Sequence, residues 1–127
     1  MLYGEELIKN NRLEWFENRT QVRKYTVEFA CPEFTCLCPR SGFPDFATIN
    51  IKYVPDQRCI ELKSLKLYIN GFRDKKIFHE DVVNIILDDL VELLDPWEIE
   101  VVGDFSVRGN IKTIIRATHK KESPKFH

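Results

Sequence analysis

The hydrophobic period of this chain changes near residue 54, and the change predicts both strands and helices. From Asp45 to Tyr53, apolar and polar residues alternate with the two-residue period of a half-buried strand. From Leu62 onward, apolar residues recur every three or four positions, which predicts a helix ending near Gly71. A chain with both patterns needs a sheet covered by helices, so the expected class is α+β.

The remaining patterns predict three more strands and a second helix. We expect strands at Gln21–Ala30, Glu98–Val107 and Ile111–Thr118. The second helix is expected from Asp81, as its N-cap, to the stop signal Asp95-Pro96. The order is therefore β-β-α-α-β-β, a four-stranded antiparallel sheet with two helices on one face. The uncovered face is expected to carry alternating apolar residues.

The chain of 127 residues has the length of one domain. Residues 1–20 are predicted to form a loose N-terminal arm, residues 21–119 the domain, and residues 120–127 a frayed polar tail. The outer strands lack obvious protection against edge pairing, and a closed ring of subunits would pair these edges. We therefore expect a homo-oligomer.

Composition favours a protein that binds neither nucleic acid directly nor a membrane. The chain is 43% hydrophobic and 31% charged, as in ordinary globular proteins. Its net charge of −1 creates no field that attracts nucleic acid or an anionic membrane. No apolar run approaches the roughly 18 residues of a membrane span, and the N-terminus lacks the order of a signal peptide. The expected location is the cytoplasm.

The chain has four cysteines, at positions 31, 36, 38 and 59. Disulfides would need a secreted context, and the spacing does not match the paired cysteines of a zinc ribbon. No metal site is expected. A reactive thiol is the best functional interpretation, and a buried inert cysteine is the structural alternative.

A thiol and a carboxylate flank a turn rich in proline and glycine. Cys38 precedes Pro39, and Asp45 follows after Gly42 and Pro44. If the turn folds back, the thiolate could attack a substrate and the carboxylic acid could deliver a proton. The alternative is a simple turn with Cys38 packed beneath it.

Two lysines on the first predicted helix suggest an anion site. Lys63 and Lys66 share a helical face, near backbone N–H groups that suit phosphate. The alternative is a solvated lysine pair. The five glycines form neither a dinucleotide-binding fingerprint nor a P-loop, so a dinucleotide would be held differently. Glu80, beside His79, could accept hydrogen bonds from a guanine-like edge, although a surface histidine is the simpler interpretation.

These segments occur together in a known family. The motifs are Phe34–Pro39, Gly42–Ala47, Glu61–Tyr68, Phe78–Asp81 and Arg108–Gly109. In this order and spacing the chain resembles the NADPH-dependent 7-cyano-7-deazaguanine reductases, the nitrile reductases of queuosine biosynthesis, in their short single-module form. The resemblance extends from about Tyr25 to about Ile111. It implies the tunnelling fold (T-fold), which assembles into rings such as stacked pentamers.

The resemblance also implies roles for individual residues. Cys38 would add to the nitrile carbon of 7-cyano-7-deazaguanine to give a thioimide, and Asp45 would be the general acid. The residues implied in substrate binding are Ile60, Glu61, Leu62, His79 and Glu80. The residues implied in binding the cofactor NADPH are Leu62, Lys63, Ser64, Lys66, Arg108 and Gly109. Two hydride transfers would then convert the nitrile into a primary amine.

One position departs from the family pattern, where Cys36 replaces a usual serine. It is interpreted as a plain substitute for that serine, and a thiol switch with Cys38 is the alternative. Two other functions stay open within the same fold. One is an amidinotransferase that acts on the same nitrile. The other is a protein that binds a pterin or purine; if it were an enzyme that converts such a base, it would need zinc.

Overall fold

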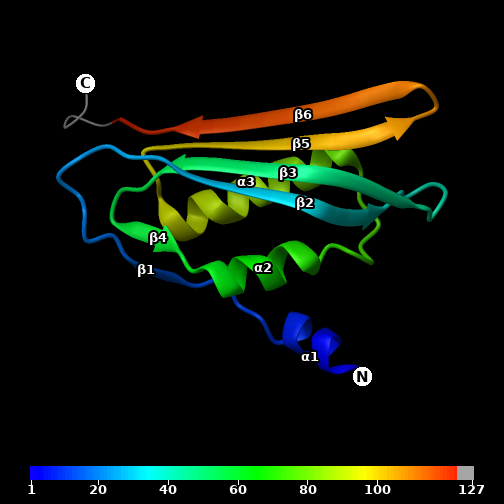
Figure 1. Cartoon of the computed structure of the whole chain (residues 1–127), viewed down its shortest axis with the longest axis horizontal. Coiled ribbons are helices and arrows are strands. Elements are labelled where there is room, and N and C mark those ends of the chain that lie inside the picture. Colours follow the sequence, from blue (N-terminus) through cyan, green and yellow to red (C-terminus); the bar gives the residue numbers. More distant parts are fainter. Residues whose placement is uncertain (123–127) are drawn as a thin grey trace.

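Two long hairpins form one four-stranded antiparallel sheet. The computed structural model describes residues 1–122. Across the sheet the order is β2 (Val27–Leu37), β3 (Pro44–Val54), β5 (Glu98–Arg108) and β6 (Ile111–Lys120) (Figure 1). Because β3 pairs antiparallel with β5, the turns of the two hairpins lie at the same end of the sheet. The predicted α+β class and the order of the long elements are confirmed.

Strand β2 begins and ends later than the sequence pattern predicted. The expected strand at 21–30 is replaced by one that starts at Val27 and continues past Pro32. The pairing with β3 shifts in register at that proline. A bulge on an edge strand tolerates a residue without a backbone N–H, so the strand is not stopped there. As a result Cys36 lies inside β2, and the predicted bounds are wrong.

Helix α3 (His79–Leu94) begins earlier than predicted and ends where predicted. Its N-cap is Phe78, so the prediction of Asp81 as the N-cap is wrong. Asp81 lies in the first turn, where a carboxylate interacts favourably with the helix dipole. At the other end Asp95 adopts a left-handed conformation with φ of 45°, and Pro96 follows, which stops the helix.

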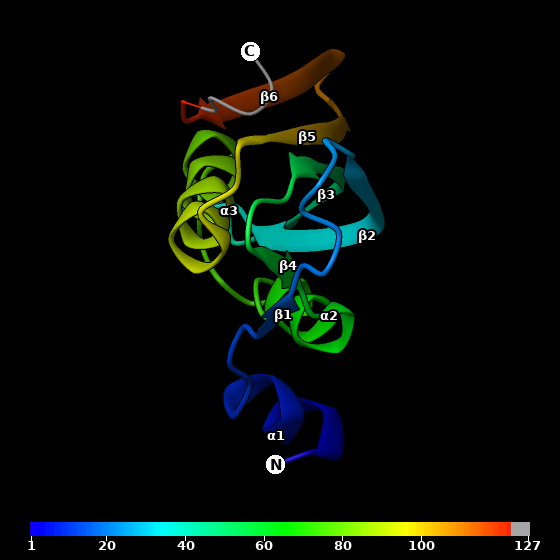
Figure 2. The same cartoon turned by 90° about the vertical axis from the view of Figure 1, so that its left-hand side faces the viewer.

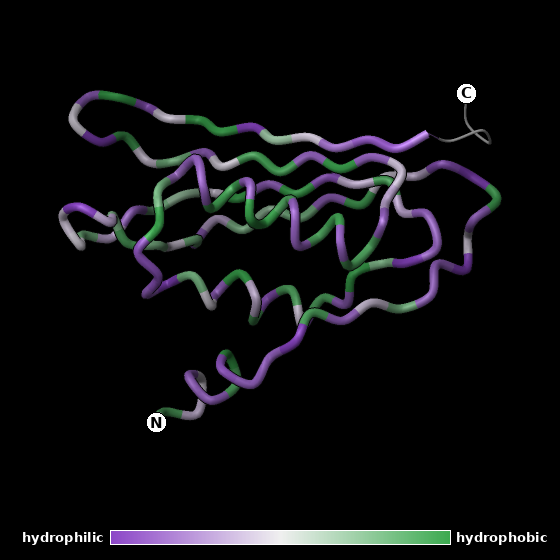
Figure 3. The backbone as a smooth tube through the Cα atoms, turned by 180° about the vertical axis from the view of Figure 1, so that it is seen from behind, coloured by the Kyte–Doolittle hydropathy of each residue, from purple (hydrophilic) through white to green (hydrophobic). Residues whose placement is uncertain are grey.

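Both long helices cover the same face of the sheet. Helix α2 (Leu62–Asn70) ends before Gly71, as predicted. It packs against β2, while α3 packs against β5 and β6 (Figure 2). Apolar and polar residues alternate along the strands (Figure 3), and the apolar side chains face the helices. This arrangement places the hydrophobic core between the helices and the sheet.

The core is tightly packed where α3 crosses β5. Ile49 and Val101 from the sheet and Ile86 from α3 are completely buried there. A Cβ atom on Gly103 would lie 2.6 Å from Cγ2 of Val83. Glycine at this position therefore allows α3 to approach the sheet this closely at Val83, near the N-terminal end of the helix.

The opposite face of the sheet is largely polar, so the prediction of alternating apolar residues there is wrong. Arg116 pairs with Glu100 at 3.1 Å, and Lys112 pairs with Asp104 at 2.5 Å. The apolar side chains of the alternating pattern point to the other face of the sheet, which packs against the helices. Strands β2 and β6 form the two edges of the sheet.

The N-terminal segment is more ordered than the loose arm that the sequence predicted. Helix α1 (Tyr3–Lys9) contacts α2, on the side away from the sheet (Figure 1). Strand β1 (Trp15–Glu17) pairs with β4 (Arg58–Ile60) as a separate two-stranded sheet. Neither short strand was predicted. The domain boundaries at residues 21 and 119 stay a prediction.

The start of the predicted C-terminal tail is also held in place. Lys120 is the last residue of β6. The ammonium group of Lys121 lies 2.8 Å from carboxylate oxygens of both Asp56 and Asp95. Residues 123–127, the rest of the predicted tail, lie outside the described residues.

Candidate active site

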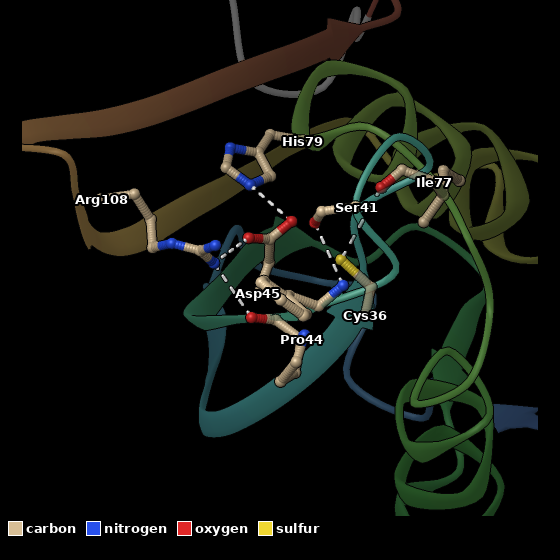
Figure 4. A network of polar contacts seen from close by, with 8 residues as sticks. Cys36, Ser41, Pro44, Asp45, Ile77, His79 and Arg108 are labelled. Carbon is tan, nitrogen blue, oxygen red and sulfur yellow. Dashed lines mark hydrogen bonds and ion pairs between the residues drawn. The ribbon is translucent and has the colours of Figure 1, made fainter.

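A buried carboxylate lies where the two hairpins and the start of α3 meet. Asp45, at the beginning of β3, is buried. Its Oδ1 accepts a hydrogen bond of 2.6 Å from Nη1 of Arg108, the last residue of β5 (Figure 4). Its Oδ2 lies 3.2 Å from Nε2 of His79, the first residue of α3. The same Arg108 nitrogen donates to the carbonyl of Pro44 at 3.0 Å, so Arg108 fixes this end of β3.

The imidazole of His79 is held against an aromatic ring. It stacks on Phe105 with ring centroids 3.8 Å apart and an angle of 13° between the planes. This contact from β5 orients Nε2 toward the Asp45 carboxylate. The sequence predicted separate roles for His79 and Asp45, whereas the structure brings the two side chains together, with Nε2 and Oδ2 3.2 Å apart. Glu80, the next residue, is exposed in the first turn of α3.

The predicted nucleophile lies in the turn between β2 and β3. The turn is closed by two backbone hydrogen bonds of 2.8 Å, from Cys38 N–H to Phe43 and from Gly42 N–H to Cys38. Hydrogen bonds from the hydroxyl of Ser41 and from the backbone N–H groups of Ser41 and Arg40 lower the pKa of Cys38 below its ordinary value. A lowered pKa favours the thiolate, which is the reactive form. Sequence reasoning missed Ser41, although a hydroxyl residue inside a predicted turn was a usable signal.

Replacement of Ser41 by alanine should raise the pKa of Cys38, because the largest stabilising contact to the thiolate is lost. The measurement is the rate of Cys38 alkylation by iodoacetamide as a function of pH, followed by peptide mass mapping. The midpoint of that profile should move to higher pH in Ser41→Ala and stay in place in Ser106→Ala, an exposed serine on β5. An unchanged midpoint in Ser41→Ala would rule out this role for the hydroxyl.

Cys36 differs from Cys38 in every property that controls thiol reactivity. It is completely buried in β2, and its Sγ lies 4.0 Å from the carbonyl oxygen of Ile77 (Figure 4). Burial, followed by the nearby charges of Asp45 and Cys38, raises the pKa of Cys36 to about 11. All four cysteines are free. These properties agree with the interpretation of Cys36 as a substitute for serine, which stays a prediction.

The other predicted substrate-binding residues lie at the opposite end of the sheet. The backbone N–H of Ile60 donates to the hydroxyl of Tyr53 at 3.0 Å. Tyr53 and Asp45 are eight residues apart on β3, which is about 26 Å in a strand. One chain therefore does not bring Ile60, Glu61 and Leu62 to the Cys38 end of the sheet (Figure 1).

The backbone N–H groups at the start of α2 are already bound to a carboxylate of the chain itself. Glu61 caps this helix, and its carboxylate accepts hydrogen bonds from the N–H groups of Lys63 (2.9 Å) and Ser64 (2.7 Å). These two bonds lower the pKa of Glu61. The expectation that these N–H groups are available to phosphate is therefore wrong, because a carboxylate occupies them. The two lysines of the segment are both exposed.

Ser64 is also engaged within the chain. It is buried, its hydroxyl donates to the carbonyl of Glu61 at 2.8 Å, and it accepts from the N–H of Glu14 at 3.0 Å. In this structure Ser64 joins the N-terminal segment to α2. A role for Ser64 in cofactor binding stays a prediction.

Neither a metal centre nor a membrane helix is found in the part of the chain that the structure describes. Among residues 1–122, no three His, Cys, Asp or Glu side chains gather closely enough to hold a metal ion. Over the same residues, no helix has the length and apolar character that crossing a membrane requires.

Comparison with solved structures shows the fold. A crystal structure of the archaeosine synthase QueF-Like, in the apo form, matches with a TM-score of 0.67. The match covers 79% of this chain and 96% of that chain. At 16% identity, this likeness shows a shared architecture, and the expected tunnelling fold is confirmed.

Comparison with protein families and curated proteins is more specific. The model of a family described as "QueF-like protein" matches residues 44–124. NADPH-dependent 7-cyano-7-deazaguanine reductases from Acaryochloris marina and Trichormus variabilis are 56% and 52% identical to this chain. Each match covers 94% of this chain, and 83% and 88% of the respective relatives. The enzyme of the same name from Thermosynechococcus vestitus is 48% identical over 97% of this chain and 93% of its own length. The resemblance seen in the motifs is thereby confirmed, and the chain belongs to the QueF-like family, among the NADPH-dependent 7-cyano-7-deazaguanine reductases.

Proposed function

We propose that this protein reduces the nitrile of 7-cyano-7-deazaguanine to the primary amine of 7-aminomethyl-7-deazaguanine, with NADPH as reductant, in the biosynthesis of queuosine in tRNA. The observation that carries the proposal is the position of an activated thiol, Cys38, at the same end of the sheet as the Asp45–His79 pair. A nitrile needs a nucleophile at carbon and a proton at nitrogen. Relatives about half identical to this chain carry the reductase name.

The first chemical step would use Cys38 and Asp45. The Cys38 thiolate forms a bond to the nitrile carbon, and one π bond between carbon and nitrogen breaks. The electron pair goes to nitrogen, which takes a proton from Asp45, the proposed general acid. His79 Nε2, 3.2 Å from Asp45 Oδ2, orients this carboxyl group and can share its proton. Arg108 holds the second oxygen and thereby the direction of the group.

Two lysines on α2 could bind the phosphate groups of NADPH. NADPH, when bound, supplies hydride to the carbon atom. Within residues 1–122, the side chains of Lys63 and Lys66 make no ion pair, so both are available to phosphate groups. Leu62, Ser64, Arg108 and Gly109 complete the proposed cofactor-binding set. Of these, Arg108 is bound to Asp45 in this structure.

Substrate recognition would depend on Glu80 and on a second copy of the chain. The exposed Glu80 carboxylate can accept hydrogen bonds from the guanine-like edge of the substrate, beside His79. The segment Ile60–Leu62 lies beside Tyr53, whose position on β3 is about 26 Å along the strand from Asp45. We therefore place that segment of one chain against the Cys38 end of another. Within residues 1–122, β2 and β6 are the edge strands of the sheet, and apart from the bridge between Leu37 and Lys76 the outer edge of β2 is open, which supports a homo-oligomeric ring.

A shared site predicts that two inactive variants restore each other in mixed oligomers. Cys38→Ala and Glu61→Ala break different halves of the proposed site, so co-refolded mixtures should regain intact sites and NADPH oxidation. Cys38→Ala mixed with Glu80→Ala is the control, because both residues belong to the same half and no intact site can form. Equal recovery in the two mixtures, or a monomeric mass by light scattering at micromolar concentration, would contradict a site shared between copies.

The alternatives are separated by the product. An amidinotransferase would form the same adduct and consume no NADPH, and a pterin- or purine-binding protein would form no adduct. With substrate and NADPH, mass spectrometry should show a product about 4 Da heavier than the nitrile, because two hydrides and two protons are added. Cytoplasmic location, expected from composition, stays a prediction.

A further inference from the structure

Helix α3 meets β5 through two pairs of residues. His79 and Val83 are one helical turn apart, so their side chains point to the same side of α3. Gly103 and Phe105 are two residues apart on β5, and both lie on the buried face of the strand. The imidazole of His79 stacks on Phe105, and Val83 lies against Gly103. The position of His79 is therefore tied to the way in which α3 lies on β5.

Two neighbours share the space beside Gly103. A Cβ atom at this position would lie 2.6 Å from Cγ2 of Val83 and 2.7 Å from Cε2 of Phe105. Because non-bonded carbon atoms make their best contact at about 3.5–4.0 Å, neither neighbour could keep its place beside an alanine. The contact with Val83 concerns how closely α3 approaches the sheet. The contact with Phe105 is a separate matter, since it concerns the ring on which the imidazole lies.

The ring of Phe105 is enclosed between two small residues. It is paired with Ala47 on the neighbouring strand β3, and along its own strand it lies close to Gly103. Only 1% of Phe105 is exposed, so a displaced ring has no open solvent into which it could turn. A glycine inside a strand weakens the strand and often marks a place where another group approaches closely. Here the approaching group is the ring that supports His79.

This support fixes a distance that the proposed chemistry uses. The stack holds the imidazole so that its Nε2 lies 3.2 Å from Oδ2 of Asp45 (Figure 4). Full reduction adds two protons to the nitrile, so the direction of the Asp45 carboxyl group matters twice in each turnover. A displacement of about 1 Å among reacting groups can lower a rate about a hundredfold. A shift of the Phe105 ring would therefore slow reduction without removing any reacting group.

We propose that Gly103 is a positioning residue for the reduction: the absence of a side chain there lets Phe105 hold His79 at the Asp45 carboxyl group. Gly103 lies outside all the sequence motifs of the candidate site. The inference rests on the proposed reductase function and adds to it a residue that acts through its neighbours.

The test begins with the rates of the two parts of the reaction. Gly103→Ala should lower steady-state NADPH oxidation about a hundredfold. Formation of the Cys38 adduct, followed by intact mass, should stay within a few-fold of wild type. Phe105→Leu keeps apolar volume but removes the flat ring, and it should have the same effect. Leu90→Ala truncates a buried residue farther along α3 and controls for lost stability, so it should keep turnover within a few-fold of wild type.

Two double variants decide which neighbour carries the effect. Val83→Ala removes the methyl group that meets the new Cβ atom, so with Gly103→Ala it relieves the helix contact and leaves the ring contact. This double variant should stay as slow as Gly103→Ala. Gly103→Ala combined with Phe105→Leu should be no slower than Phe105→Leu alone, because both changes act through one ring. Recovery of turnover on addition of Val83→Ala would make Gly103 a packing residue and overturn the proposal.

The imidazole gives a readout that lost stability alone does not reproduce. Carbon-bound protons of His79 lie over the face of Phe105, where the aromatic ring current shifts their NMR signals upfield. His79→Gln removes these signals and so assigns them. Gly103→Ala and Phe105→Leu should move them downfield, toward those of the exposed His119, and Leu90→Ala should not. Unchanged signals in folded Gly103→Ala would overturn the proposal.

The spectra separate this inference from the function on which it rests, because they are recorded without nitrile or NADPH. If the His79 signals move in Gly103→Ala while NADPH oxidation falls no more than adduct formation does, only the positioning role fails. If wild-type protein forms no adduct and oxidises no NADPH, the proposed function fails, and the positioning role fails with it.

Discussion

Cys38→Ala should abolish nitrile reduction, with NADPH oxidation falling by at least about a thousandfold, because no other group can form the covalent adduct. The thiol of Cys38 is the one whose pKa is lowered by the turn that holds it. Cys36, two residues earlier, is buried and its pKa is raised to about 11. Loss of Cys38 therefore leaves the site without a nucleophile, although the neighbouring thiol is still present.

The matched control is Cys36→Ser, which introduces the residue that the family pattern favours at this position. It should keep turnover within a few-fold of wild type, and its intact mass should still increase on reaction with the nitrile. Cys38→Ala should show no increase in mass. Loss of the adduct in Cys36→Ser together with its retention in Cys38→Ala would move the nucleophile to Cys36.

Asp45→Asn should separate adduct formation from reduction. The amide has the same shape as the carboxylic acid but cannot supply its proton, so turnover should fall by about a hundredfold to ten-thousandfold. Addition of the Cys38 thiolate to the nitrile should survive better, since the turn that lowers its pKa is unchanged. The measurement compares single-turnover adduct formation, followed by intact mass, with steady-state NADPH oxidation.

Folding must be checked in this variant because Asp45 is buried and bound to both Arg108 and His79. Adduct formation itself reports a folded site, and thermal unfolding measures the loss of stability. Rapid turnover in Asp45→Asn would show that Asp45 is not the proton donor. Equal loss of adduct formation and reduction in a folded variant would instead give Asp45 a role in positioning Cys38.

The long elements could be predicted from the sequence because each has a regular pattern of burial. The alternation in β3 and the apolar stripe of α2 come from contact with a single core. Strands β1 and β4 were missed because three residues are too short to show a period. The extension of β2 past Pro32 was missed because the bulge depends on the partner strand. The N-cap at Phe78 was missed because its side chain makes no capping hydrogen bond.

The residues of the candidate site could be listed from motifs, but their grouping could not be predicted. Contact between Asp45 and Arg108 depends on the pairing of β3 with β5. Ile60 is separated from Asp45 because it contacts Tyr53, which is eight residues along β3 from Asp45, and the motifs alone gave no sign of this. Ser64 and Glu61 look like polar contacts for a ligand in the sequence, whereas the structure uses their side chains to join and cap α2.

The most direct test of the proposed reaction is its stoichiometry. Wild-type protein is mixed with a limiting amount of 7-cyano-7-deazaguanine, and the loss of NADPH absorbance is followed to completion. About two NADPH should be consumed for each nitrile, because each hydride supplies two of the electrons that convert a nitrile to an amine. No consumption of NADPH by the folded wild-type protein would contradict its function as a nitrile reductase.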